Sequence, residues 1–177
     1  MMSETQNQLI KYLQELSSDE REATLHRCCG SVRWAKALSE ALLAEQLHDH
    51  ESLFKLSEQI WHSLDKVDYL EAFSHHPQIG ADPAKLRERF QHTHEWSAHE
   101  QSGMQSASED TIMRLAQANQ EYLAKFGYIF IVCASGKSAD EMLKLLEQRL
   151  PNTAENEIQI AAGEQAKITR LRMEKLL

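Results

Sequence analysis

Residues 108–127, SEDTIMRLAQANQEYLAKFG, carry the clearest helical pattern in this chain of 177 residues. Apolar side chains recur every three or four positions from Ile112 to Phe126, which is the spacing of one face of an α-helix. Ser108 followed by two acidic residues is typical of a helix N-terminus, and Gly127 is typical of the residue that ends a helix. The stretch therefore predicts one long amphipathic helix with a buried face.

Similar patterns on both sides predict helices over most of the remaining chain. Asp82-Pro83 supplies an acceptor at the cap and a proline at the first helical position, and Ser138 precedes another helical run. A last helix is expected from about Thr153 to the end of the sequence. Glycine (6) and proline (3) are scarce, which disfavours a turn-rich β protein. Because we find no linker or internal repeat, we expect an all-α fold, a single-domain helical bundle over residues 1–177.

Tyr128–Ala134, YIFIVCA, is the exception to the helical pattern. The segment is rich in aromatic and β-branched residues and is continuously apolar rather than alternating, so it predicts a fully buried extended segment. A lone extended segment cannot form a sheet, and its backbone groups need partners in loops, helix ends or a ligand. An extended wall of a pocket is favoured over a buried first turn of helix.

The composition argues against several classes of partner. The net charge is −8 without an offsetting block of Lys and Arg, which disfavours a nucleic acid held through its phosphates. No apolar run approaches the roughly 20 residues needed to cross a membrane, and the first ten residues lack the layout of a signal peptide. Three cysteines, of which Cys28 and Cys29 are adjacent, make a poor disulfide framework. We therefore expect a cytoplasmic protein with reduced thiols and no membrane association.

Nine histidines raise the possibility of a metal site, which can be judged from their spacing. His94 and His99 are five positions apart, so on a helix they would point about 140° away from each other. His92 and His94 diverge further, and no cysteine cluster supplies additional ligands. We expect no metal site. A metal-dependent hydrolase that uses His92, His94 and His99 is kept as an alternative hypothesis, which chelator-sensitive activity would support.

Two breaks in the helical pattern place an ionisable group beside a residue that disrupts helices. In the first break, Pro77 moves His76 out of helical geometry. In the second, Glu100 precedes Gly103 near an expected helix C-terminus, where the helix dipole disfavours a carboxylate. Each break taken alone is consistent with an ordinary helix end. A histidine and a glutamate brought together in one pocket, however, can move protons near neutral pH.

Taken together, these features resemble one family, the 2-oxo-4-hydroxy-4-carboxy-5-ureidoimidazoline (OHCU) decarboxylases, which carry out the last step from urate to (S)-allantoin. The order and spacing of the matching residues hold from about Leu70 to the end of the chain. The matches are Phe73, His76-Pro77-Gln78-Ile79-Gly80, Trp96-Ser97, Glu100-Gln101, Gly103, Asn119, Tyr122, Lys125-Phe126-Gly127-Tyr128, Phe130-Ile131-Val132-Cys133, Arg149-Leu150, Asn152, Glu157, Glu164, Lys167-Ile168 and Leu171-Arg172.

The resemblance implies an all-α homodimer that needs no metal or organic cofactor. It implies that His76 is the catalytic acid/base and that Glu100 is its partner. The substrate-binding positions that it implies are Pro77, Ser97, Gln101, Ile131 and Arg172. Arg170 is a rival to Arg172 because the two arginines lie so close in sequence. Many relatives carry a proline near the middle of Tyr128-Ile129-Phe130, and this chain departs from them there.

The implied activity is decarboxylation of OHCU to (S)-allantoin in urate catabolism, with stereospecific protonation by the His76–Glu100 pair. The substrate class is a small molecule, OHCU. The competing hypothesis is a non-enzymatic helical interaction domain, in which both breaks are ordinary helix ends. That hypothesis predicts no pocket and no stereochemical effect on the decay of OHCU.

Overall fold

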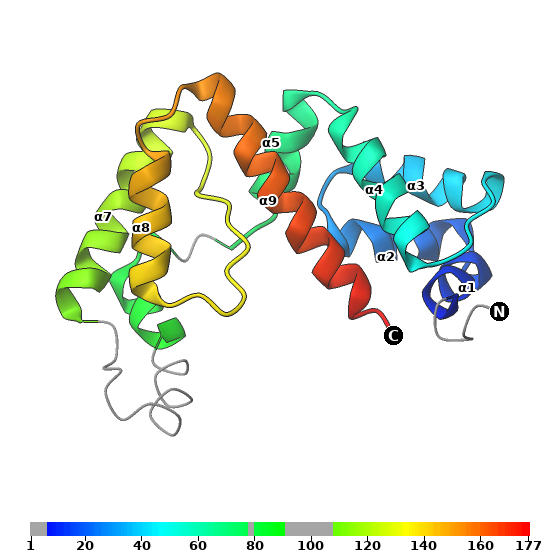
Figure 1. The fold of residues 1–177 in the computed structure, drawn as a ribbon, viewed down its shortest axis with the longest axis horizontal. Helices are drawn as coiled ribbons and strands as arrows, with labels where there is room; N and C mark the ends of the chain where they lie inside the picture. The colour runs from blue at the N-terminus through cyan, green and yellow to red at the C-terminus, as the bar shows by residue number, and fades with distance from the viewer. Residues whose placement is uncertain (1–6, 78–79, 91–107) are drawn as a thin grey trace. The chain divides into compact units, whose positions relative to one another are not determined.

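A computed structural model describes residues 7–77, 80–90 and 108–177 of the chain (Figure 1). Every regular element within these residues is a helix, which confirms the predicted all-α fold. Contacts divide the chain into two compact units, of which one contains residues 1–75 and 162–177 and the other contains His76–Ala161. The expectation of a single domain stays a prediction, and each unit is described by itself.

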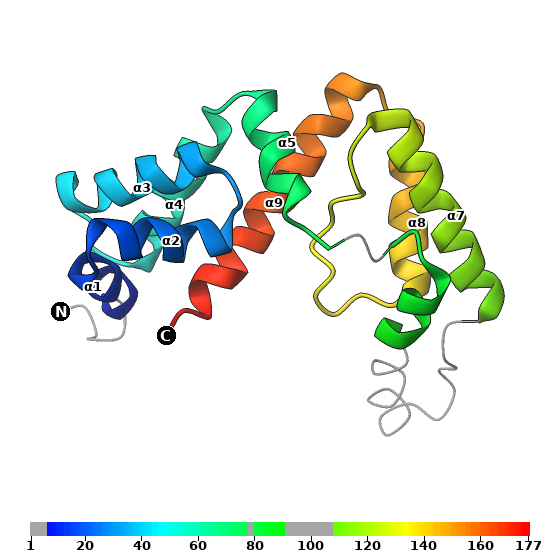
Figure 2. The same ribbon diagram turned by 180° about the vertical axis from the view of Figure 1, so that it is seen from behind.

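The first unit is built from five helices and the C-terminal part of a sixth. These are α1 (Gln8–Glu15), α2 (Ser18–Cys28), α3 (Val32–Ala44), α4 (His50–His62), α5 (Lys66–Ser74) and α9 (Ala154–Glu174) from Ala162 onward. Leucines and the indole of Trp34, all fully buried, fill the space between α1, α2, α3 and α4, which lie together in both ribbon views (Figures 1 and 2). Trp61 of α4 donates from Nε1 to the carbonyl of Ala162 at 2.8 Å, which ties α9 into this unit.

Helices α2 and α3 of the first unit begin at serine N-caps, whose side chains accept hydrogen bonds from backbone N–H groups of the first turn. Ser17 Oγ accepts from the N–H of Glu20, and the Glu20 carboxylate accepts from the N–H of Ser17, so the two residues form a capping box. Ser31 caps α3 by accepting from the N–H of Trp34. Such caps are local, and each contributes about 1 kcal/mol to helix stability.

The second unit contains a helical stretch at residues 83–90, α7 (Glu109–Phe126), α8 (Ala139–Arg149) and α9 up to Ala161. Helices α7 and α8 pack side by side (Figure 1). The sequence pattern of residues 108–127 is confirmed at both ends, because Ser108 Oγ accepts from the N–H of Thr111 and Gly127 adopts a φ of +83°. The stretch at 83–90 begins as predicted, with Asp82 accepting from the N–H of Ala84.

Two glycines of opposite conformation provide a test of these helix assignments. We expect Gly127→Ala to lower the free energy of unfolding by about 1–2 kcal/mol, because a Cβ is strained in the left-handed conformation. Gly163 lies inside α9, and a Cβ added there meets no atom of the described residues within 4 Å. Gly163→Ala should therefore raise the unfolding free energy by up to about 1 kcal/mol. Urea denaturation of both variants measures the two changes in unfolding free energy. Changes of the same sign would contradict the assignment of Gly127 to a helix end and of Gly163 to a helix interior.

The segment 128–134 between α7 and α8 is not helical, as predicted, but the prediction of full burial is wrong. Tyr128 and Ile131 are buried, whereas the other members of the segment are half-buried. A continuous apolar run predicts that the segment packs against the protein, but it does not predict which of its side chains face the core.

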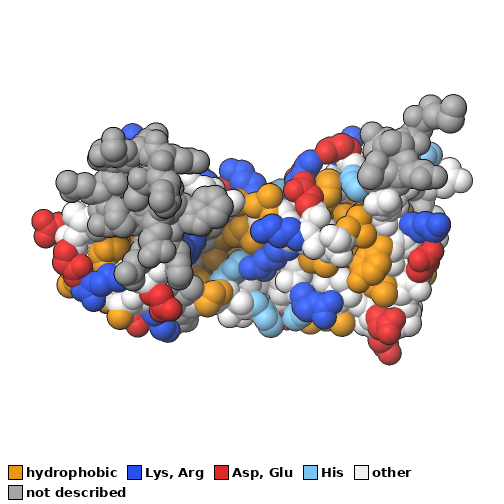
Figure 3. All heavy atoms as spheres, turned by 90° about the horizontal axis from the view of Figure 1, so that it is seen from below, with side chains coloured by type: hydrophobic (Ala, Val, Ile, Leu, Met, Phe, Trp, Pro, Cys, Tyr) orange, Lys and Arg blue, Asp and Glu red, His pale blue; other side chains and the backbone are white. Residues whose placement is uncertain are grey.

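None of the described helices is both long and apolar enough to cross a lipid bilayer. On the face drawn in Figure 3, basic and acidic side chains are interspersed over the described residues. The expectations about nucleic acid and compartment stay predictions.

Candidate active site

The predicted site residues are distributed over both units and over an undescribed stretch. Ser97, Glu100 and Gln101 lie outside the described residues, as do His92, His94 and His99. His76, Pro77 and Ile131 belong to the second unit, and Arg172 belongs to the first. The meeting of these residues in one pocket therefore stays a prediction.

His76 lies two residues beyond the end of α5. The helix ends at Ser74, and the N–H of His75 still reaches the carbonyl of Ala72 at 3.2 Å. His76 is half-buried and Pro77 is exposed, so the imidazole leaves the helix at the break that the sequence predicted.

The neighbouring His75 is exposed but also makes packing contacts that the sequence did not reveal. Its ring packs edge to face against His26, with 5.0 Å between the ring centroids. A Cβ at Gly30 would come within 2.6 Å of the His75 ring, so glycine is required there for this packing. The contact fixes the C-terminal end of α5, from which the chain continues to His76.

Arg170 and Arg172, the two rival arginines, have different surroundings on α9. Arg170 pairs with Glu51 at 2.6 Å and with Glu174 at 3.1 Å. Its guanidinium also lies over the Phe54 ring at 4.5 Å. These two carboxylates raise the pKa of Arg170 through hydrogen bonds and engage most of its donors.

Arg172 is half-buried and donates from Nη1 to the carbonyl of Cys28 at 3.3 Å. Among the described residues, no carboxylate lies within ion-pair distance of Arg172. A guanidinium has five N–H donors, so Arg172 retains the capacity to bind an anionic oxygen. The surroundings of the two arginines therefore favour Arg172 over Arg170 as a substrate-binding cation.

Ile131 is held by a buried polar network. Its carbonyl accepts from Arg149 Nη1 at 2.7 Å, and Arg149 Nε contacts both oxygens of Glu157 at 3.0 and 2.9 Å. Tyr122 Oη donates to Glu157 at 2.9 Å. Burial raises the pKa of Tyr122 far above its usual range, which keeps this hydroxyl protonated as a donor. The resemblance included these residues, but no pattern of spacing indicated that they meet.

The thiols of Cys28 and Cys29 are buried and poorly suited to act as nucleophiles. Burial raises the pKa of Cys28 to about 11, although the positive charge of Arg172 partly offsets this effect. Burial likewise raises the pKa of Cys29 to about 12. Both values are far above neutral pH, so both thiols are protonated there, and we assign them as structural residues.

We expect iodoacetamide at pH 8 to label half-buried Cys133 before Cys28 and Cys29. With a pKa of about 11, roughly one Cys28 thiol in a thousand is ionised at that pH. Peptide mass spectrometry over a time course gives the order, and labelling in urea provides the control in which all three thiols react. Labelling of Cys28 or Cys29 at the rate of Cys133 in the folded protein would contradict this assignment.

The described residues contain no group of three or more His, Cys, Asp or Glu side chains that could hold a metal ion. The histidines that raised the metal hypothesis lie outside them, so that hypothesis stays a prediction.

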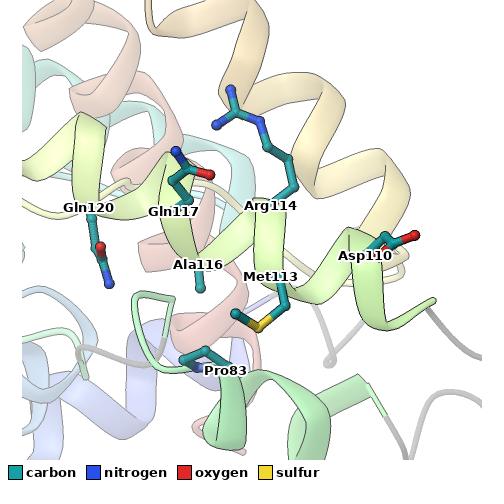
Figure 4. A pocket seen from close by; sticks show the side chains of 7 residues that line it. All are labelled: Pro83, Asp110, Met113, Arg114, Ala116, Gln117 and Gln120. Carbon is teal, nitrogen blue, oxygen red and sulfur yellow. The ribbon is translucent and has the colours of Figure 1, made fainter.

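One open pocket of about 400 Å³ occurs against α7 in the second unit. Pro83 and Met113 face each other across it, and Asp110, Arg114, Ala116, Gln117 and Gln120 complete the lining (Figure 4). None of these residues belongs to the predicted site.

Within its described residues the chain is all-α, with a His-Pro break after a short helix and an apolar non-helical segment between two helices. The sequence matches the OHCU decarboxylase family over residues 14–174. This chain belongs to the OHCU decarboxylase family.

Individual relatives agree with this assignment. The chain is 39% identical over 164 residues to the uric acid degradation bifunctional protein TTL of Arabidopsis thaliana, which covers 92% of this chain and 48% of that protein. It is 35% identical over 77 residues to the 2-oxo-4-hydroxy-4-carboxy-5-ureidoimidazoline decarboxylase of Mus musculus, covering 44% of this chain and 43% of that one. The chain thus spans about half the length of the bifunctional plant relative.

Solved structures show the same fold. A structure of OHCU decarboxylase in the presence of (S)-allantoin superposes with a TM-score of 0.66 at 37% identity, covering 85% of this chain and 94% of that chain. A structure of (S)-allantoin synthase gives a TM-score of 0.70 at 21% identity, covering 93% of this chain and 52% of that one. The second match supports the fold alone.

Proposed function

We propose that this protein is a carboxy-lyase that converts OHCU to (S)-allantoin in urate catabolism. The family match over residues 14–174 is the observation that carries the proposal. It is supported by the name of the plant relative, which concerns uric acid degradation, and by the structural relative obtained with (S)-allantoin.

The chemistry of the substrate explains why the reaction needs no cofactor. The carboxylate of OHCU is attached to a carbon next to a ring C=N bond. When the C–C bond to the carboxylate breaks and CO2 leaves, its electron pair forms a C=C bond between that carbon and the neighbouring ring carbon, and the former C=N pair ends on nitrogen. The substrate therefore supplies its own electron sink, and the protein has to orient the carboxylate and transfer protons.

His76 and Glu100 are the groups that we assign to proton transfer. A histidine changes charge near neutral pH, and general acid–base catalysis typically contributes about 10²–10⁴-fold to the rate. The position of His76 beyond the end of α5 supports this role, because its side chain projects from a break in the helical chain. Delivery of a proton to one face of the carbon would then produce the S enantiomer.

The remaining contacts are assigned by the chemistry of their side chains. Arg172 would dock a carboxylate or ureido oxygen through its two-pronged donors. Ser97 and Gln101 would hold the ureido arm. Pro77 and the backbone at Ile131 would line the ring, and an apolar wall there excludes water and strengthens the polar contacts. We also assign the protein a homodimeric state, no cofactor and a cytoplasmic location.

Circular dichroism of OHCU made freshly from urate tests the proposal. OHCU decays spontaneously to racemic allantoin, so the measurement must follow optical activity rather than loss of substrate. With the protein present, we expect faster loss of the OHCU signal and the appearance of the (S)-allantoin signal. Racemic allantoin formed at the spontaneous rate would refute the proposal and favour a helical interaction domain.

A further inference from the structure

The segment 128–134 is held from the α8 side by one buried arginine. Arg149 is the last residue of α8, and only 7% of it is exposed. Its Nη1 donates to the carbonyl of Ile131 at 2.7 Å, and its guanidinium lies over the ring of Phe130 at 4.4 Å. Arg149 therefore contacts two successive residues of the segment: the ring of Phe130 and the backbone carbonyl of Ile131.

Arg149 is itself fixed by a carboxylate with no exposure to solvent. Glu157 accepts from Arg149 Nε, from Tyr122 Oη and from Asn152 Nδ2 at 3.3 Å. Glu157 also lies in the first turn of α9, where the helix dipole favours negative charge. A buried ion pair with this many satisfied hydrogen bonds fixes the guanidinium in a single orientation.

Other backbone contacts of the segment lie near its end. Near its end, Cys133 and Ala134 offer their carbonyls to the Nζ and the N–H of Lys137, at 2.7 and 3.1 Å. The bond from Arg149 to Ile131 holds the backbone in the middle of the segment. That is the part which the proposed function places against the substrate ring.

We propose that Arg149 is a positioning residue that sets the backbone at Ile131 for substrate binding, with Glu157 orienting its guanidinium. This inference rests on the proposed function, and it assigns Arg149 no proton transfer and no contact with OHCU. A lysine could keep one charged contact at this position. It could not reproduce the planar fork that serves Glu157 and Ile131 together while stacking on Phe130.

The test compares Arg149→Lys with Arg114→Lys. Arg114 is a half-buried arginine of α7 paired with Glu121 and Glu147, so its substitution controls for the loss of a guanidinium elsewhere in the same unit. For Arg149→Lys we expect a fall in kcat/KM of about 10–100-fold and a lower enantiomeric excess of (S)-allantoin, because small displacements of substrate-positioning groups are costly. The pH dependence of kcat/KM should keep its shape, because the proposed acid–base groups His76 and Glu100 are intact.

Hydrogen exchange provides a readout that does not depend on the substrate. We expect amides 129–133 to exchange about tenfold faster in Arg149→Lys than in the unsubstituted protein, the equivalent of one hydrogen bond. If the unsubstituted protein lacks activity on OHCU, the proposed function fails, whereas faster exchange would still support the positioning of the segment by Arg149. Folded Arg149→Lys protein with exchange and kcat/KM equal to those of Arg114→Lys would overturn the inference.

Phe130→Leu decides the question if Arg149→Lys does not fold. It removes the ring beneath the guanidinium and leaves the Arg149–Glu157 ion pair in place. Faster exchange at residues 129–133 together with a lower kcat/KM would support the inference, and unchanged values of both would overturn it.

Discussion

Substitution of His76 by alanine is expected to lower the enzymatic rate of (S)-allantoin formation by about 10²–10⁴-fold, the usual contribution of a general acid or base. Because His76 lies beyond the end of α5 and is half-buried, its truncation should leave helix content and melting temperature close to those of the unsubstituted protein. The rate is measured by circular dichroism on freshly made OHCU, so that spontaneous racemic decay does not contribute to the signal.

His62→Ala is the matched control for this experiment. His62 is an exposed histidine at the C-terminal end of α4, and its removal should leave the rate unchanged. Glu100→Gln should cause a loss comparable to that of His76→Ala if the two residues act together. Normal production of (S)-allantoin by folded His76→Ala protein would show that this histidine has no catalytic role.

Substitution of Arg172 by glutamine is expected to lower kcat/KM by about 10–150-fold, which corresponds to the 1.5–3 kcal/mol of a hydrogen bond to a charged group. The physical reason is that Arg172, within the described part of the chain, donates to the backbone carbonyl of Cys28 and retains further donors for a substrate oxygen. Arg172→Lys should recover only part of the loss, because a lysine binds as a single point charge. Steady-state kinetics on OHCU measures both variants.

Arg170→Gln is the comparison that distinguishes the two arginines. Arg170 is engaged by Glu51 and Glu174 on a partly exposed surface, where such pairs contribute at most about 1 kcal/mol to stability. We therefore expect near-normal kcat/KM for this variant. A large loss for Arg170→Gln together with normal activity of Arg172→Gln would reverse the assignment.

The elements that the sequence predicted well are those determined by local interactions. Helix α7 begins at Ser108 and ends at Gly127 as expected, because a serine cap and a left-handed glycine act on their own backbone neighbours. Pro77 likewise acts locally, because it disfavours the helical conformation of His76, the residue before it. Such features can be predicted without knowledge of what packs against the helix.

The features that the sequence did not reveal depend on tertiary contacts. The run from Tyr128 to Ala134 predicted full burial, yet only Tyr128 and Ile131 are buried. Arg149 ends α8 and Glu157 lies in the first turn of α9, so the two charges meet across a turn between two helices, where helical spacing does not apply. The packing of His75 against Gly30 likewise depends on the path of the chain between them.

The bond between Trp61 and Ala162 has a consequence for biosynthesis. The two residues are 101 positions apart in sequence, so the core around α4 cannot close until α9 has been translated. Chains emerge from the ribosome at about 5–20 residues per second, so the apolar faces of the first helices wait at least several seconds for this partner. Contacts of such high sequence separation slow folding and prolong exposure to aggregation. Nascent chains stalled before Ala162 should accordingly depend on chaperones for solubility.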